Sequence, residues 1–202
     1  VWWSTAPTVY RQCSGSALRH HDAGRTFELS EDAFWVVQSG ALWIMKLDYC
    51  GREAPLALLG PQMVFSRRLV SPSGYYFARA ETDVEVLRLS WSEIRHSAAL
   101  STQFNGRLVD LLLHMEAWLA LHRQDSAVEQ LRGFLVLVAE QFGRPESSGV
   151  RLGLRLTHGQ IGEALGRERS TISRAIAQLK TDGWLREEKD STLVLCRPLP
   201  AI

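Results

Sequence analysis

A dense group of guanidinium, ammonium and hydroxyl side chains lies near the C-terminal end of the chain. Its members are Arg167, Arg169, Ser170, Thr171, Ser173, Arg174 and Lys180. Guanidiniums donate paired hydrogen bonds to guanine edges, and hydroxyl and ammonium groups bind bases and phosphates. These residue types therefore predict contacts to double-stranded DNA, with Arg169 and Arg174 reading guanine and Lys180 holding the backbone.

Two short helices are needed to present this group to a DNA groove. Apolar residues recur at helical spacing in residues 161–165 and again in residues 172–179. Gly166 lies between them, where the left-handed turn that joins two helices disfavours other residues. Gly162 leaves room for the second helix to pack closely on the first. This pattern predicts a helix-turn-helix whose second helix begins near Glu168.

The flanking residues supply helix ends and a hairpin. Thr157 and Gln160 have the spacing of a capping box at the start of the first helix, and Thr157 and His158 join the predicted DNA contacts. Residues 181–183 form a helix stop. Residues 184–187 and 193–196 are typical of two short strands, which predicts a wing beside the second helix.

Residues 25–198 resemble the CRP/FNR family of bacterial transcription regulators. The N-terminal half carries the hairpin run VVQSGALWIMKLDYCGREAPLALLGP, and the middle carries LHRQDSAVEQLRGFLVLVAEQFG, which is most similar to the nitrogen-control branch. The resemblance implies an effector-sensing domain, a homodimer and RNA polymerase as a further partner. Ser170 stands where many relatives carry glutamate, so the preferred DNA half-site should differ from theirs.

The expected fold class is α+β with three regions. Residues 1–97 form an antiparallel β-roll of the cyclic-nucleotide-binding type, residues 98–124 a long dimerisation helix and hinge, and residues 125–202 a winged helix-turn-helix domain. The roll is expected because short apolar segments alternate with turn residues up to residue 89. No structure is predicted for the first two dozen residues. Residues 144–149 have the composition of a loop.

A long helix is expected from Trp91 to about His122. Its apolar residues fall at alternating spacings of four and three, as in a coiled-coil seam: Phe104, Leu108, Leu111, Met115, Trp118 and His122. Leu112 and Leu119 form a second stripe that could cover the roll. An ordinary core helix is the simpler alternative. We assign all of these residues except His122 to a two-fold dimer interface.

The roll lacks the residues with which family members bind cyclic nucleotides. The corresponding stretch reads Phe65-Ser66-Arg67-Arg68, without the ribose-binding carboxylate, and Tyr76-Phe77 precedes Ala78, without the phosphate-pairing arginine. Activation by cAMP is therefore not expected.

Relatives of the nitrogen-control type bind 2-oxoglutarate through arginines, which can pair carboxylates bidentately. Four arginines are the candidates for such an effector here: Arg67, Arg68, Arg79 and Arg123. Gly74 stands where that branch is expected to carry a roll-strand arginine. The alternative is that these arginines face solvent or pair with Glu81, Asp83 and Glu85.

The remaining chemistry-bearing residues do not form a metal or catalytic pattern. Cys13, Cys50 and Cys196 are far apart and odd in number, which favours reduced thiols, and an all-cysteine iron–sulfur cluster needs four. The adjacent histidines His20 and His21 would point to opposite faces of a strand. We therefore expect no metal, no cofactor and no enzymatic activity.

Charge is distributed unevenly although the net charge is only +1. Residues 151–202 hold nine basic and six acidic side chains, which places an excess of three positive charges around the predicted reading helix. The apolar runs fall far short of the 18 or so residues of a membrane span, so a soluble cytoplasmic protein is expected. The alternative function is a small-molecule-binding or scaffolding protein whose winged helix mediates protein contacts.

Overall fold

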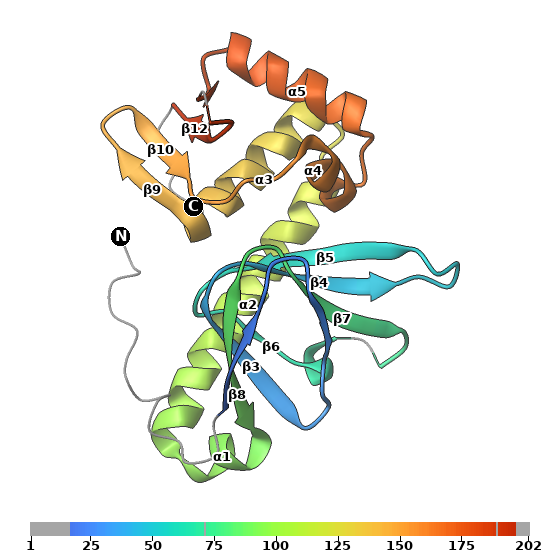
Figure 1. Cartoon of the computed structure of the whole chain (residues 1–202), viewed down its shortest axis with the longest axis vertical. Coiled ribbons are helices and arrows are strands. Elements are labelled where there is room, and N and C mark those ends of the chain that lie inside the picture. The colour runs from blue at the N-terminus through green and yellow to red at the C-terminus, as the bar shows by residue number, and fades with distance from the viewer. Residues whose placement is uncertain (1–16, 71, 189, 197–202) are drawn as a thin grey trace. The chain divides into compact units, whose positions relative to one another are not determined.

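The computed structural model describes residues 17–70, 72–188 and 190–196 (Figure 1). The chain divides into two compact units, residues 1–115 and 116–202. The expected region boundaries after residues 97 and 124 stay predictions.

The N-terminal unit contains two four-stranded sheets in which neighbouring strands run antiparallel. The first has the order β1 (Ala17–His21), β8 (Val84–Ser90), β3 (Ala33–Ser39) and β6 (Val64–Phe65). The second has the order β2 (Thr26–Glu28), β7 (Tyr75–Ala80), β4 (Leu42–Leu47) and β5 (Glu53–Leu59). The expected antiparallel β-roll is confirmed.

Sequence patterns recognise the long strands of the roll but not its short ones. Residues 33–37 of β3 and 42–45 of β4 are continuously buried, as expected of strands covered on both faces. Strands β7 and β8 are the last two of the short segments expected up to residue 89. Strands β2 and β6 are three and two residues long, too short for a periodic signal.

The turn from β3 to β4 depends on Gly40. Its φ of 82° lies in the left-handed region, and a Cβ added there would come within 2.1 Å of the Asp83 carbonyl oxygen. The backbone NH of Ala41 also donates to the Thr82 hydroxyl, at 2.9 Å. The close approach of two turns therefore excludes a side chain at this position.

The helix expected from Trp91 consists of two helices, α1 (Trp91–His96) and α2 (Ala98–His122). Ser90 and Glu93 form a complete capping box at the start of α1. Ser97 interrupts the run because its backbone is extended, and its hydroxyl accepts a hydrogen bond from the Leu100 NH at 3.3 Å. A second cap thus separates the two helices.

Helix α2 packs on the roll through the residues that were predicted to face a partner subunit. Phe104 is 2% exposed and packs edge-on against Phe34, and the partly buried Leu108 and Leu111 contact the same core cluster. Leu112 and Leu119, predicted to cover the roll, are 69% and 65% exposed. The stripe that packs on the roll is therefore the one that holds Phe104, and the assignment of both stripes to a dimer interface stays a prediction.

The C-terminal unit holds the rest of α2 and a small helical domain. Trp118, also assigned to the seam, is buried edge-on against Phe134 of α3 (Ala127–Phe142). Ser126 caps α3 by accepting a hydrogen bond from the Glu129 NH. The remaining helices are α4 (His158–Leu165) and α5 (Arg169–Thr181).

A four-stranded antiparallel sheet completes this unit, in the order β11 (Leu185–Glu187), β12 (Leu193–Leu195), β10 (Gly149–Leu152) and β9 (Gly143–Glu146). Strands β11 and β12 are the two predicted strands of the wing. Most of β9 and the first residue of β10 lie within residues 144–149, where composition predicted a loop. Gly149 permits this hairpin, because its φ is 141° and a Cβ would come within 1.9 Å of the Leu195 carbonyl oxygen.

Two glycine substitutions separate the effect of crowding from that of backbone strain. Gly51, between β4 and β5, has a φ of 76° and open space around it, so Gly51→Ala should lower the free energy of unfolding by about 1–2 kcal/mol. Gly40→Ala adds the clash with Asp83 and should cost about 1–3 kcal/mol more. Urea denaturation of both variants measures the difference, and equal losses would contradict the crowding at Gly40.

Candidate nucleic-acid interface

Helix α4 begins with the predicted capping box. The Thr157 hydroxyl accepts a hydrogen bond from the Gln160 NH at 3.2 Å, and Gln160 Oε1 accepts from the Thr157 NH at 2.8 Å. Two otherwise unpaired NH groups of the first turn are thereby satisfied, so the helix has a defined start.

The turn between α4 and α5 has the predicted geometry. Gly166 adopts a left-handed conformation with φ 64° and ψ 33°. A Cβ on Gly162 would lie 2.6 Å from the Arg167 carbonyl oxygen, so only glycine allows this approach. Glu168 is the N-cap of α5. The helix-turn-helix expected from the sequence is confirmed.

One face of α5 presents polar side chains to solvent while the other is buried. The buried residues are Ile172, Ala175, Ile176 and Leu179. On the opposite face Arg169, Ser170 and Arg174 are exposed, and Thr171 is half-buried with its hydroxyl 3.3 Å from an Arg174 guanidinium nitrogen. Within the described part of the chain, no carboxylate forms a salt bridge with Arg169 or Arg174. This face therefore offers two guanidiniums to an external acceptor.

Two other predicted DNA contacts, His158 and Ser173, hydrogen-bond each other. The Ser173 hydroxyl donates to the Arg169 carbonyl at 3.0 Å, so it accepts from His158 Nδ1 at 2.9 Å. This hydrogen bond joins the first turn of α4 to α5. It therefore helps to hold the exposed polar face of α5 in its orientation relative to α4.

The cationic side chains around the wing form ion pairs with acidic residues. Lys180 pairs with Glu187 of β11, and Arg186 pairs with Glu188 at 3.3 Å. Arg155 pairs with Asp190 at 2.9 Å, and hydrogen bonds from Thr192, together with the positive charge of Arg155, hold the pKa of the Asp190 carboxyl below its ordinary value. The unpaired positive charge of the region is thus concentrated on α5 rather than on the hairpin.

Arg167 was predicted to contact DNA, but its guanidinium faces the interior of the C-terminal unit. Its Nε donates to Gln130 Oε1 at 2.8 Å, and one terminal nitrogen lies 3.2 Å and 3.1 Å from the carbonyl oxygens of Gln124 and Asp125. This assignment is corrected, because the side chain reaches the residues between α2 and α3. Arg167 ties the helix-turn-helix to that segment.

Gln130 completes the same connection and is a buried polar residue that the sequence reasoning missed. It is 2% exposed, and its Nε2 donates to the Leu165 carbonyl at 3.1 Å while its Oε1 accepts from Arg167. His122 Nε2 adds a contact of 3.2 Å to the Ala164 carbonyl. A glutamine on the apolar face of a predicted helix, next to Leu131, is the signal that could have revealed this cluster.

Arg67 and Arg68, two of the four arginines predicted to bind an anionic effector, bond to backbone carbonyls of the N-terminal unit. Arg67 contacts the carbonyl oxygens of Pro72 and Gly74 at 3.0 Å and 3.3 Å, and its guanidinium lies 5.3 Å from the centre of the Tyr76 ring. Arg68 donates to the Glu31 carbonyl at 2.7 Å. These two side chains stabilise the loop around the turn at residues 67–69.

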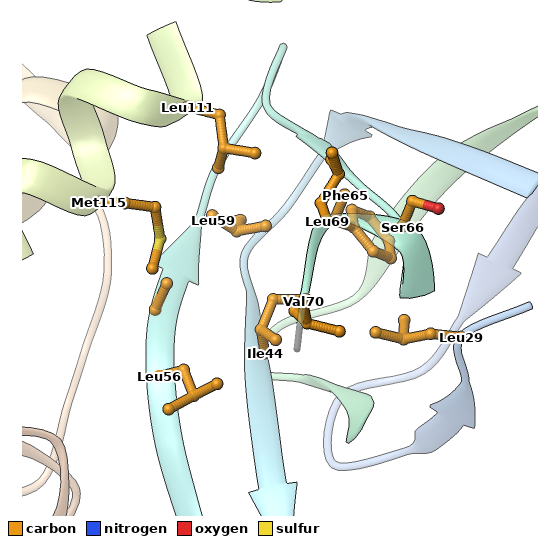
Figure 2. Close-up of a pocket in the computed structure, with 11 residues that line it drawn as sticks. Leu29, Ile44, Leu56, Leu59, Phe65, Ser66, Leu69, Val70, Leu111 and Met115 are labelled. Atoms are coloured by element: carbon orange, nitrogen blue, oxygen red, sulfur yellow. The ribbon is translucent and has the colours of Figure 1, made fainter. Parts of the chain in front are cut away.

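The other two candidates are Arg79 of β7 and Arg123, which directly follows α2. Arg79 pairs with Glu53 at 3.2 Å. Arg123 is exposed in the C-terminal unit. A cavity in the N-terminal unit is lined by residues that include Ile44, Phe65 and Met115 (Figure 2). None of the four arginines is among its lining residues.

The described residues contain no cluster of three or more histidine, cysteine, aspartate or glutamate side chains able to hold a metal ion. Cys50 and Cys196 are free thiols, and Cys13 lies outside the described residues. Among the described residues, no helix is both long enough and apolar enough to cross a bilayer.

Comparison with known proteins places these features in context. Residues 106–198 match the Crp-like helix-turn-helix domain. The chain is 25% identical over 169 residues to the CRP-like cAMP-activated global transcriptional regulator of Mycobacterium tuberculosis, covering 81% of this chain and 75% of the relative. It is 28% identical over 163 residues to the global nitrogen regulator of a Synechocystis species, covering 77% and 72%.

Solved structures show the same fold. The structure of FixK2 from Bradyrhizobium japonicum aligns with a TM-score of 0.72 at 21% identity, covering 90% of this chain and 93% of that one. A cyclic nucleotide-binding domain containing protein from Listeria monocytogenes aligns with a TM-score of 0.77 at 10% identity, covering 94% and 92%. The expected α+β architecture, with a roll followed by a helix-turn-helix, is thereby confirmed.

The structural role of Arg167 gives a stability prediction. Arg167→Ala leaves the side-chain Oε1 of Gln130 buried without its donor and should lower the free energy of unfolding by about 1–3 kcal/mol. Arg167→Lys should not restore it, because a single ammonium cannot reach all three acceptors. The exposed Arg174→Ala is the matched control and should change stability by less than about 0.5 kcal/mol. Chemical denaturation of the full chain tests this, and equal effects at both positions would contradict the role of Arg167.

Proposed function

We propose that this chain, a CRP/FNR-type protein that carries a Crp-like helix-turn-helix domain over residues 106–198, is a transcription regulator that binds palindromic DNA as a homodimer. The single observation that carries the proposal is the exposed face of α5, where Arg169 and Arg174 lie without acidic partners. Matching curated relatives are transcription regulators rather than enzymes, which supports a role without catalysis.

DNA reading would use the N-terminal half of α5 in a major groove. Arg169 and Arg174 donate to guanine edges, Thr171 and Ser170 add hydroxyl contacts, and the start of α4 at Thr157 approaches a phosphate. Ser170 presents a short, neutral hydroxyl that both donates and accepts, whereas a glutamate presents a longer carboxylate that only accepts, so its base preference differs from that of a glutamate at this position. Lys180 would have to leave Glu187 before it could neutralise a phosphate.

The homodimer proposal rests on the outward stripe of α2, which is large and apolar for a surface helix. The stripe consists of Val109, Leu112, Leu113, Met115 and Leu119, all between 38% and 69% exposed. A contiguous apolar surface of this kind typically marks an association site. Pairing with the same stripe of a second copy buries it with two-fold symmetry. Two reading helices would then meet half-sites about 34 Å apart.

Regulation by a cyclic nucleotide is not part of the proposal. Arg67, Arg68 and Arg79 are engaged in internal hydrogen bonds or ion pairs, and the roll offers neither of the ribose- and phosphate-binding residues of the cyclic-nucleotide members. RNA polymerase as a further partner stays a prediction.

The competing function is a scaffold whose ion-paired wing binds protein, since Lys180, Arg155 and their acidic partners form a mixed-charge surface.

Selection from a random duplex library tests DNA reading. The chain should enrich one palindrome, and Arg174→Ala should weaken binding to it by about 1–3 kcal/mol and relax one base position. Arg52→Ala, which removes the same charge from an exposed turn of the roll, is the matched control and should leave binding unchanged. Affinity should fall steeply with salt. Enrichment of no palindrome, or binding insensitive to salt, would favour the scaffold.

The dimer interface gives a separate prediction. Leu112→Glu combined with Leu113→Glu should convert a dimer to a folded monomer, because both side chains are already more than 60% exposed in the single chain. Leu18→Glu, at an equally exposed leucine of β1, should leave the dimer intact. Analytical ultracentrifugation at micromolar concentration measures the mass. A wild-type monomer, or a double variant that remains dimeric, would contradict the assignment of this stripe.

A further inference from the structure

His158 is the first residue of α4, and its half-buried imidazole lies against α5. Its Nδ1 is 2.9 Å from the hydroxyl of Ser173, which stands one turn after Arg169 and directly before Arg174 in α5. The imidazole therefore lies at the border of the proposed reading surface, where the first helix of the helix-turn-helix meets the second.

The hydrogen bonds of Ser173 decide which nitrogen of the neutral imidazole carries the proton. A hydroxyl has one proton, and Ser173 Oγ is 3.0 Å from the Arg169 carbonyl, which can only accept. Both contacts of Oγ are hydrogen bonds only if it donates to this carbonyl and accepts from His158 Nδ1. Neutral His158 therefore carries its proton on Nδ1 and a lone pair on Nε2.

The other ring nitrogen, Nε2 of His158, is accessible from outside. It is not among the buried polar atoms that lack a partner. The charged side chains of α4, of α5, of the turn between them and of the segment before α4 are Arg155, Glu163, Arg167, Glu168, Arg169, Arg174 and Lys180. Within the described part of the chain, none of them forms an ion pair with His158. An external anion thus meets no carboxylate already paired with this ring.

The protonation state of His158 decides whether Nε2 can bind a DNA phosphate. A helix-turn-helix that inserts its second helix into a major groove brings its first helix across the DNA backbone, so the start of α4 would lie near a phosphate. Phosphate oxygens only accept hydrogen bonds. The lone pair of neutral Nε2 repels such an oxygen, whereas the imidazolium donates a charge-assisted N–H···O bond to it. The contact therefore forms only when His158 is protonated.

We propose that His158 is a proton-linked phosphate contact and that Ser173 positions it, so that the chain binds DNA more tightly as the pH falls from about 8 to about 6. This inference rests on the proposed DNA-reading function. Histidine is the side chain that changes charge between about pH 5 and 8. Each subunit takes up one proton from solvent at Nε2 when the phosphate binds. By linkage, each unit of pH then changes the affinity by up to about tenfold per subunit.

Fluorescence anisotropy of the full chain tests the proposal on the palindrome that it selects and on a random duplex, at constant ionic strength and about pH 6, 7 and 8. Affinity for both duplexes should fall at least about tenfold over this range, because a phosphate contact does not depend on sequence. His158→Arg keeps a permanent charge and should bind with the same affinity throughout. His96→Gln, at an exposed histidine of α1, is the matched control and should keep the pH dependence.

Ser173→Ala tests the positioning role, and alanine is a good helix former, so α5 should persist. Without the hydroxyl, neutral His158 can carry its proton on Nε2 and donate to a phosphate without taking up another. The pH dependence of binding should therefore fall below about threefold. In the free wild-type chain, ¹⁵N-histidine NMR at about pH 8 should show the proton of His158 on Nδ1, and His158→Gln identifies its signals.

Each result decides for or against the proton-linked contact. Affinity that falls with pH in the wild type, stays constant in His158→Arg and varies less in Ser173→Ala supports it. Affinity independent of pH, or equally pH-dependent in His158→Arg, overturns it, and a proton on Nε2 in the free chain overturns the role of Ser173. Affinity that rises with pH also overturns it, because neutral Nε2 would then accept from a base amino group.

The same measurements separate this inference from the function on which it rests. A chain that selects a palindrome with an affinity independent of pH keeps the proposed function and loses the proton-linked contact. A chain that binds neither duplex at any of the three pH values contradicts both.

Discussion

The packing of Phe104 into the roll is the interaction on which the rest of the N-terminal unit depends. Its ring lies edge-on to Phe34, with centroids 4.6 Å apart, and also contacts Trp91 of α1. A buried aromatic side chain of this kind fixes the rotation of a helix about its own axis. Once Phe104 faces inward, Leu108 and Leu111 must follow at helical spacing, and Leu112 and Leu113 must face outward.

The same rotation positions the features that matter for function. Leu111 and Met115 reach the cavity because they lie four residues apart along the helix, and His114 beside them donates from Nε2 to the Leu58 carbonyl at 2.9 Å. Burial lowers the pKa of His114 to about 4, so this side chain is neutral at physiological pH. The inner side of α2 is therefore uncharged where His114 meets β5.

In the C-terminal unit, a buried polar cluster has the corresponding role. Gln130 bonds to Arg167 and to the Leu165 carbonyl, and Arg167 extends to the carbonyls of Gln124 and Asp125. A fully paired buried network specifies one arrangement, because any other would leave polar groups unsatisfied. The helix-turn-helix is thereby held to the segment that precedes α3, while the guanidiniums of Arg169 and Arg174 are left for an external partner.

The sequence by itself determined the local elements of this protein. Gly166 with Gly162, the Thr157–Gln160 cap and the apolar spacing of α5 each depend on residues close in the chain, so they predict the helix-turn-helix correctly. Only the tertiary structure decided which of several similar side chains face inward. Helix α2 is apolar on two sides, so its periodicity cannot distinguish the face that meets the roll from the face that is exposed. Arginines are equally ambiguous, because whether Arg167 or Arg174 is free depends on the carbonyls and amides that distant segments bring within reach.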